Sequence, residues 1–224
     1  ANLLKRPVGP IGSSPSLLPA AAPHLSSQGG RQSARREAPA AAAMRRVTSM
    51  SDFTEAEVGL RDFEIHGLVG EGEFGKVLMA TKLDTKQMYA MKVVRKEHLL
   101  MRGYISVNQA VTEKQVLQEI ASRPHPFVVS LHYAFQTAEC LYMLMDFVGG
   151  GDLFSLIESK GALPEEWVQI YAAELVLALE HVHSLSIIFR DLKPENVMVG
   201  MDGHLKLTDF GMSKRLDRVL EATA

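Results

Sequence analysis

Residues 189–196 read FRDLKPEN, and this stretch sets the interpretation of the whole chain. Within seven positions it holds two basic residues, two acids and an amide. A solvated turn would be expected to hold Gly or Ser instead, so a merely charged loop is the weaker interpretation. Asp209-Phe210-Gly211 follows after one predicted hairpin and brings a second carboxylate to the same edge. The side-chain oxygens of Asn196 and Asp209 are ligands of the kind that suits Mg²⁺.

The segments on either side of this stretch predict a mostly helical region. Pro164 marks the start of a long helix. Its apolar residues recur at helical spacing: Val168, Tyr171, Leu175, Leu179 and Val182. A shorter helix is expected from Asp152 to Ser159, after a run of glycines. The Asp202-Gly203 pair stands between two short apolar runs, Val197–Val199 and His204–Leu207, and predicts a β-hairpin.

Residues 62–147 predict a five-stranded antiparallel sheet with one main helix, so the fold class is α+β. The expected strands are apolar or alternating runs, namely Phe63 to Ile65, Val77 to Met79, Tyr89 to Val94, Leu131 to Phe135 and Leu141 to Phe147. A polar turn at residues 84–86 makes the first three strands a meander. The helix covers residues 109–121, where apolar side chains stand at helical spacing.

Gly70, Gly72 and Gly75 form a G-x-G-x-x-G pattern between the first two predicted strands. Glycines permit close backbone approach and positive φ, so successive N–H groups can close over phosphate oxygens. The alternative is a glycine-rich hairpin turn without a ligand. The dinucleotide-binding fold is disfavoured, because that fold requires a helix after the loop and a strand follows here.

Lys92 stands among apolar residues in the third predicted strand. An ammonium group there is costly unless it is paired with a carboxylate or a phosphate. The alternative is an edge lysine whose head reaches solvent. Glu113 on the following helix is available as a partner, which favours the paired interpretation.

Composition narrows the class of protein. The chain has 224 residues, of which 46% are hydrophobic, and this excludes collagen-like, disulfide-stapled and wholly disordered classes. Cys140 is the single cysteine, so no internal disulfide can form and we expect a soluble protein of a reducing compartment. No apolar run reaches the roughly 18 residues that a membrane helix needs.

The first 46 residues differ in charge from the rest. They hold seven Lys or Arg and one acid, whereas the remainder holds 17 Lys or Arg and 25 acids. Residues 1–57 are rich in Pro, Ala, Ser and Gly, which predicts a disordered basic tail. An organelle transit peptide has a similar composition. Because the first residue is Ala rather than Met, we expect that the natural start is missing.

Together these motifs resemble those of protein kinases, from about Phe63 to Lys214. The resemblance implies a β-rich N-lobe over residues 58–147, an incomplete α-rich C-lobe over residues 148–215, and ATP with Mg²⁺ between them. Residues 216–224 do not resemble a kinase. The family would continue with an Ala-Pro-Glu anchor and further helices. We therefore expect a fragment, a truncated isoform or an incorrect gene end, with little activity of its own.

The resemblance also implies roles for the motif residues. Asp191 would be the catalytic base and Lys193 would contact the transferred phosphoryl group. Lys92 would bind the α- and β-phosphates and pair with Glu113. The remaining roles are magnesium binding by Asn196 and Asp209, contact with an activation-segment phosphate by Arg190, and a stacked apolar spine of Leu117, Leu131, Phe189 and Phe210.

In the same way the resemblance implies an ATP site. Met145 would be the gatekeeper before a hinge at residues 146–148. The residues expected to contact ATP are Val69, Gly70, Glu71, Gly72, Glu73, Phe74, Gly75, Lys76, Val77, Ala90, Lys92, Met145, Asp146, Val148, Asp152 and Met198.

The sequence Lys193-Pro194-Glu195 is similar to that of serine/threonine kinases, because tyrosine kinases replace this lysine with a differently placed arginine. Phe189, where most kinases have His, is similar to the AGC group. Gln109 departs from that group, whose members often place a His there that reads the activation-loop phosphate. Coupling between that phosphate and the helix is therefore in doubt.

Two acids, Asp152 and Glu195, stand where AGC kinases read basic peptides. The alternatives are a helix N-cap for Asp152 and a solvated loop charge for Glu195. Paired carboxylates would favour arginines before the acceptor. Arg45-Arg46-Val47 precedes Thr48 and Ser49, which are candidates for self-phosphorylation or a pseudosubstrate role.

The expected function is transfer of the γ-phosphoryl group of ATP to Ser or Thr of proteins with a basic sequence context. The alternative is a noncatalytic nucleotide-binding or docking fragment of a kinase. We expect a cytoplasmic or nuclear monomer, activated by an upstream kinase, without nucleic-acid partners.

Overall fold

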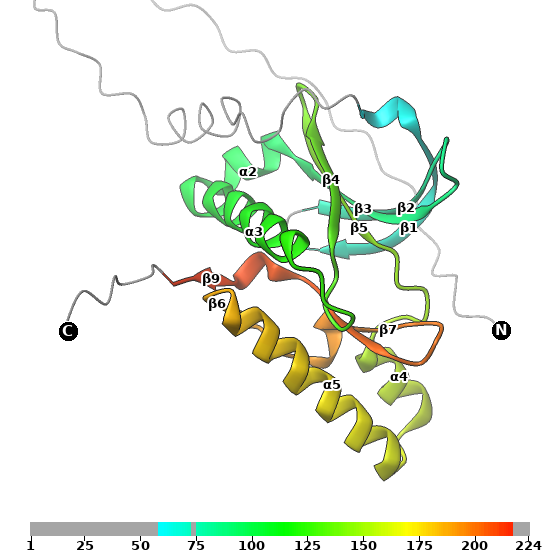
Figure 1. The fold of residues 1–224 in the computed structure, drawn as a ribbon. Coiled ribbons are helices and arrows are strands. Elements are labelled where there is room, and N and C mark those ends of the chain that lie inside the picture. The colour runs from blue at the N-terminus through cyan, green and yellow to red at the C-terminus, as the bar shows by residue number, and fades with distance from the viewer. Residues whose placement is uncertain (1–57, 73–74, 217–224) are drawn as a thin grey trace, which may run out of the picture. The chain divides into compact units, whose positions relative to one another are not determined.

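A computed structural model of the chain describes residues 58–72 and 75–216 (Figure 1). The predicted basic tail, with Thr48 and Ser49, lies outside the described residues, as do Glu73, Phe74 and residues 217–224. Within the described part of the chain, none of the helices combines the length and apolar character that crossing a membrane requires.

The N-lobe is built on a five-stranded antiparallel sheet of strand order β1-β2-β3-β5-β4. Its strands are β1 (Phe63–Gly72), β2 (Gly75–Lys82), β3 (Met88–Arg95), β4 (Leu131–Gln136) and β5 (Cys140–Asp146). The meander of the first three strands and the predicted fold class are confirmed. β5 lies between β3 and β4 and pairs with both. It ends at Asp146, where the chain leaves the sheet.

Three helical segments accompany this sheet: η1 (Leu60–Asp62), α2 (Lys96–Arg102) and α3 (Tyr104–Ser122). α3 is the predicted main helix, and it begins five residues earlier than its apolar pattern indicates. Helix α2 was not predicted from the sequence; it has seven residues and ends at Gly103, which has a φ of 85°. A glycine tolerates this positive φ, so the chain can turn there directly into α3.

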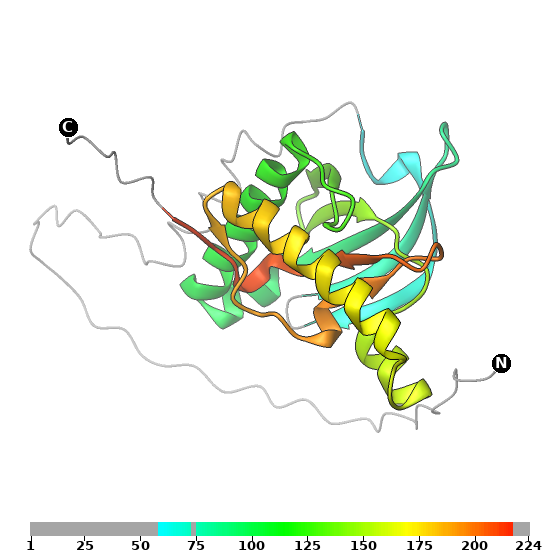
Figure 2. The same cartoon turned by 60° about the horizontal axis from the view of Figure 1, so that its bottom comes forward.

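The C-lobe segment is mainly helical, as predicted. Its elements are α4 (Leu153–Lys160), α5 (Glu165–Ser184), β6 (Ile187–Ile188), η2 (Pro194–Asn196), β7 (Val197–Val199), β8 (Leu205–Leu207), η3 (Phe210–Met212) and β9 (Lys214–Arg215). β7 and β8 form the predicted hairpin, whereas the short β6–β9 pair was not predicted. Figure 2 shows α5 in yellow across the front of the view, with the sheet behind it.

One apolar core joins the two lobes. It includes Leu117 of α3, Met143 of β5, Tyr171 of α5 and Leu207 of β8. Backbone hydrogen bonds also join the two lobes. Val129 N donates to Leu207 O at 3.0 Å, and Leu207 N donates to Phe127 O at 2.9 Å. The loop between α3 and β4 is therefore fixed to the C-lobe hairpin.

A second core consists largely of aromatic side chains within the N-lobe sheet. Phe63 of β1 packs against Tyr89 of β3 and against Tyr133 and Phe135 of β4, with ring centroids 5.8–6.3 Å apart. Contacts between β1 and β4, the two edge strands, require a strongly curved sheet. This curvature leaves the opposite face of β3 and β5 for α3 and the site.

Candidate active site

A cavity of about 510 Å³ lies between the glycine-rich strands, the hinge and the β7–β8 hairpin. Most of the predicted ATP-contacting residues line it, namely Val69, Gly70, Glu71, Gly75, Val77, Ala90, Lys92, Met145, Asp146, Val148, Asp152 and Met198. Lys76 is exposed and does not line the cavity, and Gly72 ends β1. Val129 and Thr208 also line it and were not predicted, because neither belongs to a recognisable motif.

Lys92 of β3 and Glu113 of α3 form the predicted buried pair. Lys92 Nζ lies 2.5 Å from Glu113 Oε1 and 3.6 Å from Asp209 Oδ1. Burial on its own lowers the pKa of Lys92, but the carboxylates of Glu113 and Asp209 outweigh burial, so this pKa lies above its ordinary value. The ammonium group therefore stays charged at the wall of the cavity.

Asp191, Lys193 and Asn196 form a hydrogen-bonded group in the FRDLKPEN stretch. Lys193 Nζ donates to Asp191 Oδ2 at 2.8 Å, and Asn196 Nδ2 donates to Asp191 O and Oδ2, both at 2.9 Å. The Lys193 hydrogen bond, supported by that of Asn196, lowers the pKa of the Asp191 carboxyl group. Asp191 is thus held ionised, as a hydrogen-bond acceptor requires.

Asp209 adopts a left-handed conformation, with a φ of 60°. Its carboxylate accepts a hydrogen bond from Gly211 N at 3.3 Å, and Asp209 also lines the cavity. A Cβ atom at Gly211 would lie 3.2 Å from Asp209 Oδ1, so a larger residue there would crowd this carboxylate. Gly211 therefore helps to direct Asp209 toward the cavity.

The predicted apolar spine is assembled in the core that joins the lobes. Leu117, Leu131, Phe189 and Phe210 are all buried in this core. The Phe189 and Phe210 rings pack edge to face at 5.1 Å. Phe210 is fully buried, and both Phe210 and the neighbouring Asp209 line the cavity.

Arg190, with a φ of 70°, holds the segment that follows Gly211. Its guanidinium group donates to Met212 O at 2.6 Å and to Ser213 O at 3.3 Å. Gln109 of α3 donates to the thioether of Met212 at 3.6 Å. Gln109 thus contacts the segment that follows Gly211, as Arg190 does, but through a neutral side chain. Arg190 is the residue predicted to contact a phosphate on this segment.

The glycines of the G-x-G-x-x-G pattern differ in their surroundings. A Cβ atom built at Gly75 would lie 2.0 Å from Val93 O of β3, whereas one at Gly70 would meet only Val77 Cβ at 3.8 Å. Gly75 is therefore required by the approach of β3. Gly70 lies in the cavity wall with room for a ligand.

Asp152 and Glu195, the predicted peptide-contacting acids, both line the cavity. The Asp152 carboxylate accepts hydrogen bonds from Ser155 N and Ser155 Oγ, both at 2.8 Å, and so caps α4. Glu195 is exposed in η2. The N-cap alternative for Asp152 is therefore correct, and this role does not exclude a second contact.

The oxygen donors of the cavity fit a magnesium ion that is shared with a phosphate ligand. The amide nitrogen of Asn196 is engaged by Asp191, which leaves its Oδ1 as an available ligand. Asp209 supplies carboxylate oxygens. The described residues contain no group of three or more His, Cys, Asp or Glu that could hold a metal ion. One or two protein ligands, completed by phosphates and water, are usual for Mg²⁺.

Comparison with known proteins identifies the class. Residues 63–223 match the family model described as "Protein kinase domain". Since this match covers more than half of the chain, the chain belongs to the protein kinase domain family.

Its relatives are serine/threonine kinases. The chain is 47% identical over 156 residues to "Protein kinase 2" of Dictyostelium discoideum, and 46% identical over 158 residues to the "RAC family serine/threonine-protein kinase homolog" of the same organism. It is 48% identical over 155 residues to "Ribosomal protein S6 kinase alpha-3" of Homo sapiens. The resemblance to AGC-group kinases is therefore confirmed.

The aligned regions cover 70%, 70% and 68% of this chain but 32%, 34% and 20% of those three proteins. The chain thus spans about a third or less of the length of these relatives. Family membership follows from the comparison, whereas the activity of the whole protein is a separate question.

Proposed function

We propose that the protein is an ATP- and Mg²⁺-dependent serine/threonine protein kinase. The observation that carries the proposal is the convergence of Lys92, Asn196 and Asp209 on one cavity, with Asp191 hydrogen-bonded to Asn196 beside it. Protein kinases place phosphates, metal ions and the acceptor hydroxyl with this set of groups. The supporting contacts are those of Glu113 to Lys92 and of Lys193 to Asp191.

In this proposal the nucleotide lies along the cavity. Ala90, Val77 and Met198 offer apolar contacts to the adenine, and the backbone of the hinge offers hydrogen bonds. Lys92 binds the phosphates while Glu113 holds its ammonium group in place. Asn196 and Asp209 would hold Mg²⁺, whose charge would offset the negative charge on the transferred phosphoryl group.

Asp191 accepts a hydrogen bond from the acceptor hydroxyl group and takes its proton. Its lowered pKa keeps the carboxylate ionised, so its main contribution is to orient the hydroxyl oxygen toward the phosphorus atom. Lys193, beside Asp191, places a positive charge next to the transferred group.

The proposed substrates are proteins with arginine before the acceptor Ser or Thr. Asp152 and Glu195 at the cavity rim support this preference, because carboxylates bind guanidinium groups by paired hydrogen bonds. We further propose a cytoplasmic or nuclear monomer that is activated by an upstream kinase. Thr48 and Ser49, after two arginines, are proposed phosphorylation sites.

Calorimetric titration of the purified chain with Mg-ATP tests the nucleotide site. We expect saturable binding that Asp209→Asn weakens and that Lys214→Ala, which changes an exposed lysine of β9, leaves unchanged. Transfer of radiolabelled phosphate to an arginine-containing serine peptide, by this chain and by the natural protein that contains it, tests the reaction.

Three results are distinguishable. Transfer that is lost in Asp191→Asn supports the kinase. Binding of Mg-ATP without transfer by either form would favour the noncatalytic alternative. Absence of Mg-ATP binding by a folded chain would contradict the proposal.

A further inference from the structure

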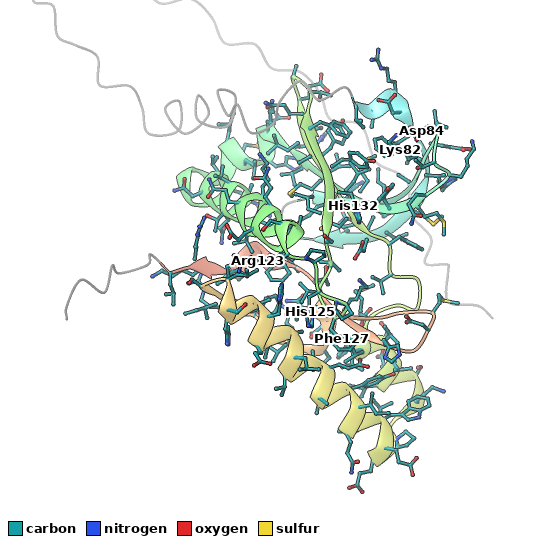
Figure 3. All side chains as sticks on the ribbon, viewed as in Figure 1. Lys82, Asp84, Arg123, His125, Phe127 and His132 are labelled. Atoms are coloured by element: carbon teal, nitrogen blue, oxygen red, sulfur yellow. The ribbon has the colours of Figure 1, made fainter. Side chains whose placement is uncertain are left out.

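A second cavity, of about 570 Å³, lies behind the hinge. His125, Ser130, His132 and Lys206 line it together with Asp146. In Figure 3 His132 lies along β4, and His125 lies between α3 and α5. Asp146 also lines the candidate active-site cavity, so this one hinge residue forms part of both walls.

The Asp146 carboxylate collects hydrogen bonds from two other elements. Lys206 Nζ of β8 donates to Asp146 Oδ2 at 2.9 Å, and Ser130 N, in the loop before β4, donates to the same oxygen at 3.2 Å. His132 Nε2 of β4 lies 2.6 Å from Asp146 Oδ1. Because a carboxylate only accepts, His132 is the donor.

The backbone of the hinge is held at the same point. Asp146 N donates to Ser130 O at 3.1 Å, so Asp146 and Ser130 are joined by two hydrogen bonds. Ser130 follows Val129, which is hydrogen-bonded to Leu207 of β8. The hinge, the loop before β4 and β8 therefore meet around one carboxylate.

This junction is partly enclosed, unlike a fully exposed surface ion pair. The side chains of His132, Asp146 and Lys206 are 39%, 23% and 31% exposed, so the carboxylate is the most enclosed member. The His132 ring also packs on Tyr89 of β3, with centroids 5.1 Å apart. The two side-chain donors come from strands whose backbones are hydrogen-bonded to β5 and β7.

Lys206 also stands three residues before Asp209, on the strand that leads to it. The Asp146 carboxylate thus links the hinge, on one side of the candidate active-site cavity, to the strand that positions Asp209. Asp146 belongs to the predicted hinge, whereas His132 and Lys206 belong to none of the motifs that define the site.

We propose that His132 and Lys206 are positioning residues that act through Asp146 to hold the hinge backbone ready for the adenine ring. The inference rests on the proposed function, in which adenine lies against the hinge. If the hinge is held before the ligand arrives, binding does not have to order it. Loss of either donor then weakens adenine recognition and leaves the phosphate end of the cavity unaffected.

The test compares two probes that occupy different ends of the cavity, adenosine and Mg-tripolyphosphate, by ligand-observed NMR. For Lys206→Ala and His132→Ala we expect the dissociation constant of adenosine to rise about fivefold, the effect of one partly exposed charged hydrogen bond. The dissociation constant of Mg-tripolyphosphate stays unchanged. Lys206→Arg and His132→Gln keep a donor and restore adenosine binding in large part.

Lys214→Ala and His66→Ala serve as matched controls, because they remove an exposed lysine and an exposed histidine away from the hinge. Unchanged adenosine affinity in both test variants would overturn the inference. An equal loss for both probes would also overturn it, since this is what general destabilisation produces.

Hydrogen exchange of the hinge amides, residues 146–148, gives a readout that needs no ligand. We expect faster exchange in Lys206→Ala and His132→Ala, with exchange in α5 unchanged. Unchanged hinge exchange would overturn the inference even if the wild-type chain bound no nucleotide. Failure of wild-type Mg-ATP binding would instead contradict the proposed function.

Discussion

Lys92 Nζ and Glu113 Oε1 lie 2.5 Å apart, and this contact joins β3 to α3 at the wall of the candidate active-site cavity. The two side chains are only 12% and 3% exposed. Removing one partner of a buried pair leaves the other charge uncompensated, at a cost of about 3–5 kcal/mol. A substitution at this pair is therefore expected to change both the stability of the protein and its binding of nucleotide.

Lys92→Met should weaken Mg-ATP binding and also lower the free energy of unfolding by about 3 kcal/mol, because Glu113 loses its partner. Lys92→Met combined with Glu113→Gln leaves no unpaired buried carboxylate at position 113 and should regain much of the stability. It should not regain nucleotide binding. Urea unfolding and calorimetric titration of both variants measure the two effects. Recovery of binding in the double variant would show that Lys92 acts only through stability.

Gly70 and Gly75 should respond differently to alanine. Gly75→Ala places a Cβ against Val93 O and should cost about 1–3 kcal/mol of stability, as overpacking does. Gly70→Ala should change stability by less than about 0.5 kcal/mol but weaken Mg-ATP binding, since the added methyl group stands in the cavity wall.

Gly67→Ala, in the same strand as Gly70, is the control, because a Cβ there meets nothing within 4 Å. Thermal unfolding and nucleotide titration separate the three variants. If Gly70→Ala binds Mg-ATP as the wild type does, the prediction that a phosphate closely approaches this glycine is wrong.

The residues of the candidate site could be predicted from the sequence more completely than the elements around them. Lys92, Asp191 and Asp209 stand in short motifs whose chemistry is unusual for their local pattern, so each could be recognised without knowing the fold. Predicting Glu113 required one further step. The charge of Lys92 among apolar residues needs a carboxylate partner, and Glu113 on the following helix is available. The structure places Lys92, Glu113 and Asp209 in the wall of one cavity, and Asp191 is hydrogen-bonded to Asn196, which also lines it.

The junction behind the hinge could not be found in this way. His132, Asp146 and Lys206 come from three strands, and no periodicity relates them. Helix α2 and the β6–β9 pair were missed for a related reason. Elements of seven or two residues carry little pattern, and the packing around them decides their structure.

Asp146 should make stability depend on pH in the acid range. Burial alone would raise its pKa, but the hydrogen bonds from His132 and Lys206 outweigh burial and lower the pKa to about 2. A lowered pKa in the folded state contributes stability above the unfolded value near 4, and this contribution is lost as the pH falls toward 2.

We therefore expect wild type to exceed Asp146→Asn in unfolding free energy by about 2 kcal/mol at pH 6, and the difference to shrink as the pH falls below 4. Urea unfolding of both proteins between pH 3 and 6 measures it. A difference that stays constant or grows toward low pH would contradict the assigned hydrogen bonds.

The last prediction separates the two roles of Asp152. Its carboxylate caps α4 through Ser155 and also lines the cavity rim. Asp152→Ala removes the cap and should cost about 1 kcal/mol, whereas Asp152→Asn keeps a good N-cap and should cost a few tenths. Both variants remove the negative charge.

If Asp152 reads arginine in substrates, the preference for Arg two or three residues before the acceptor should fall by about the same factor in Asp152→Asn and in Asp152→Ala, despite their different stabilities. A positional peptide library, phosphorylated by the natural protein that contains this chain, measures that preference. Glu195→Gln should lower it independently, since Glu195 is exposed and its loss leaves the fold intact. A preference that follows the stability of α4, falling in Asp152→Ala alone, would mean that Asp152 is an N-cap only.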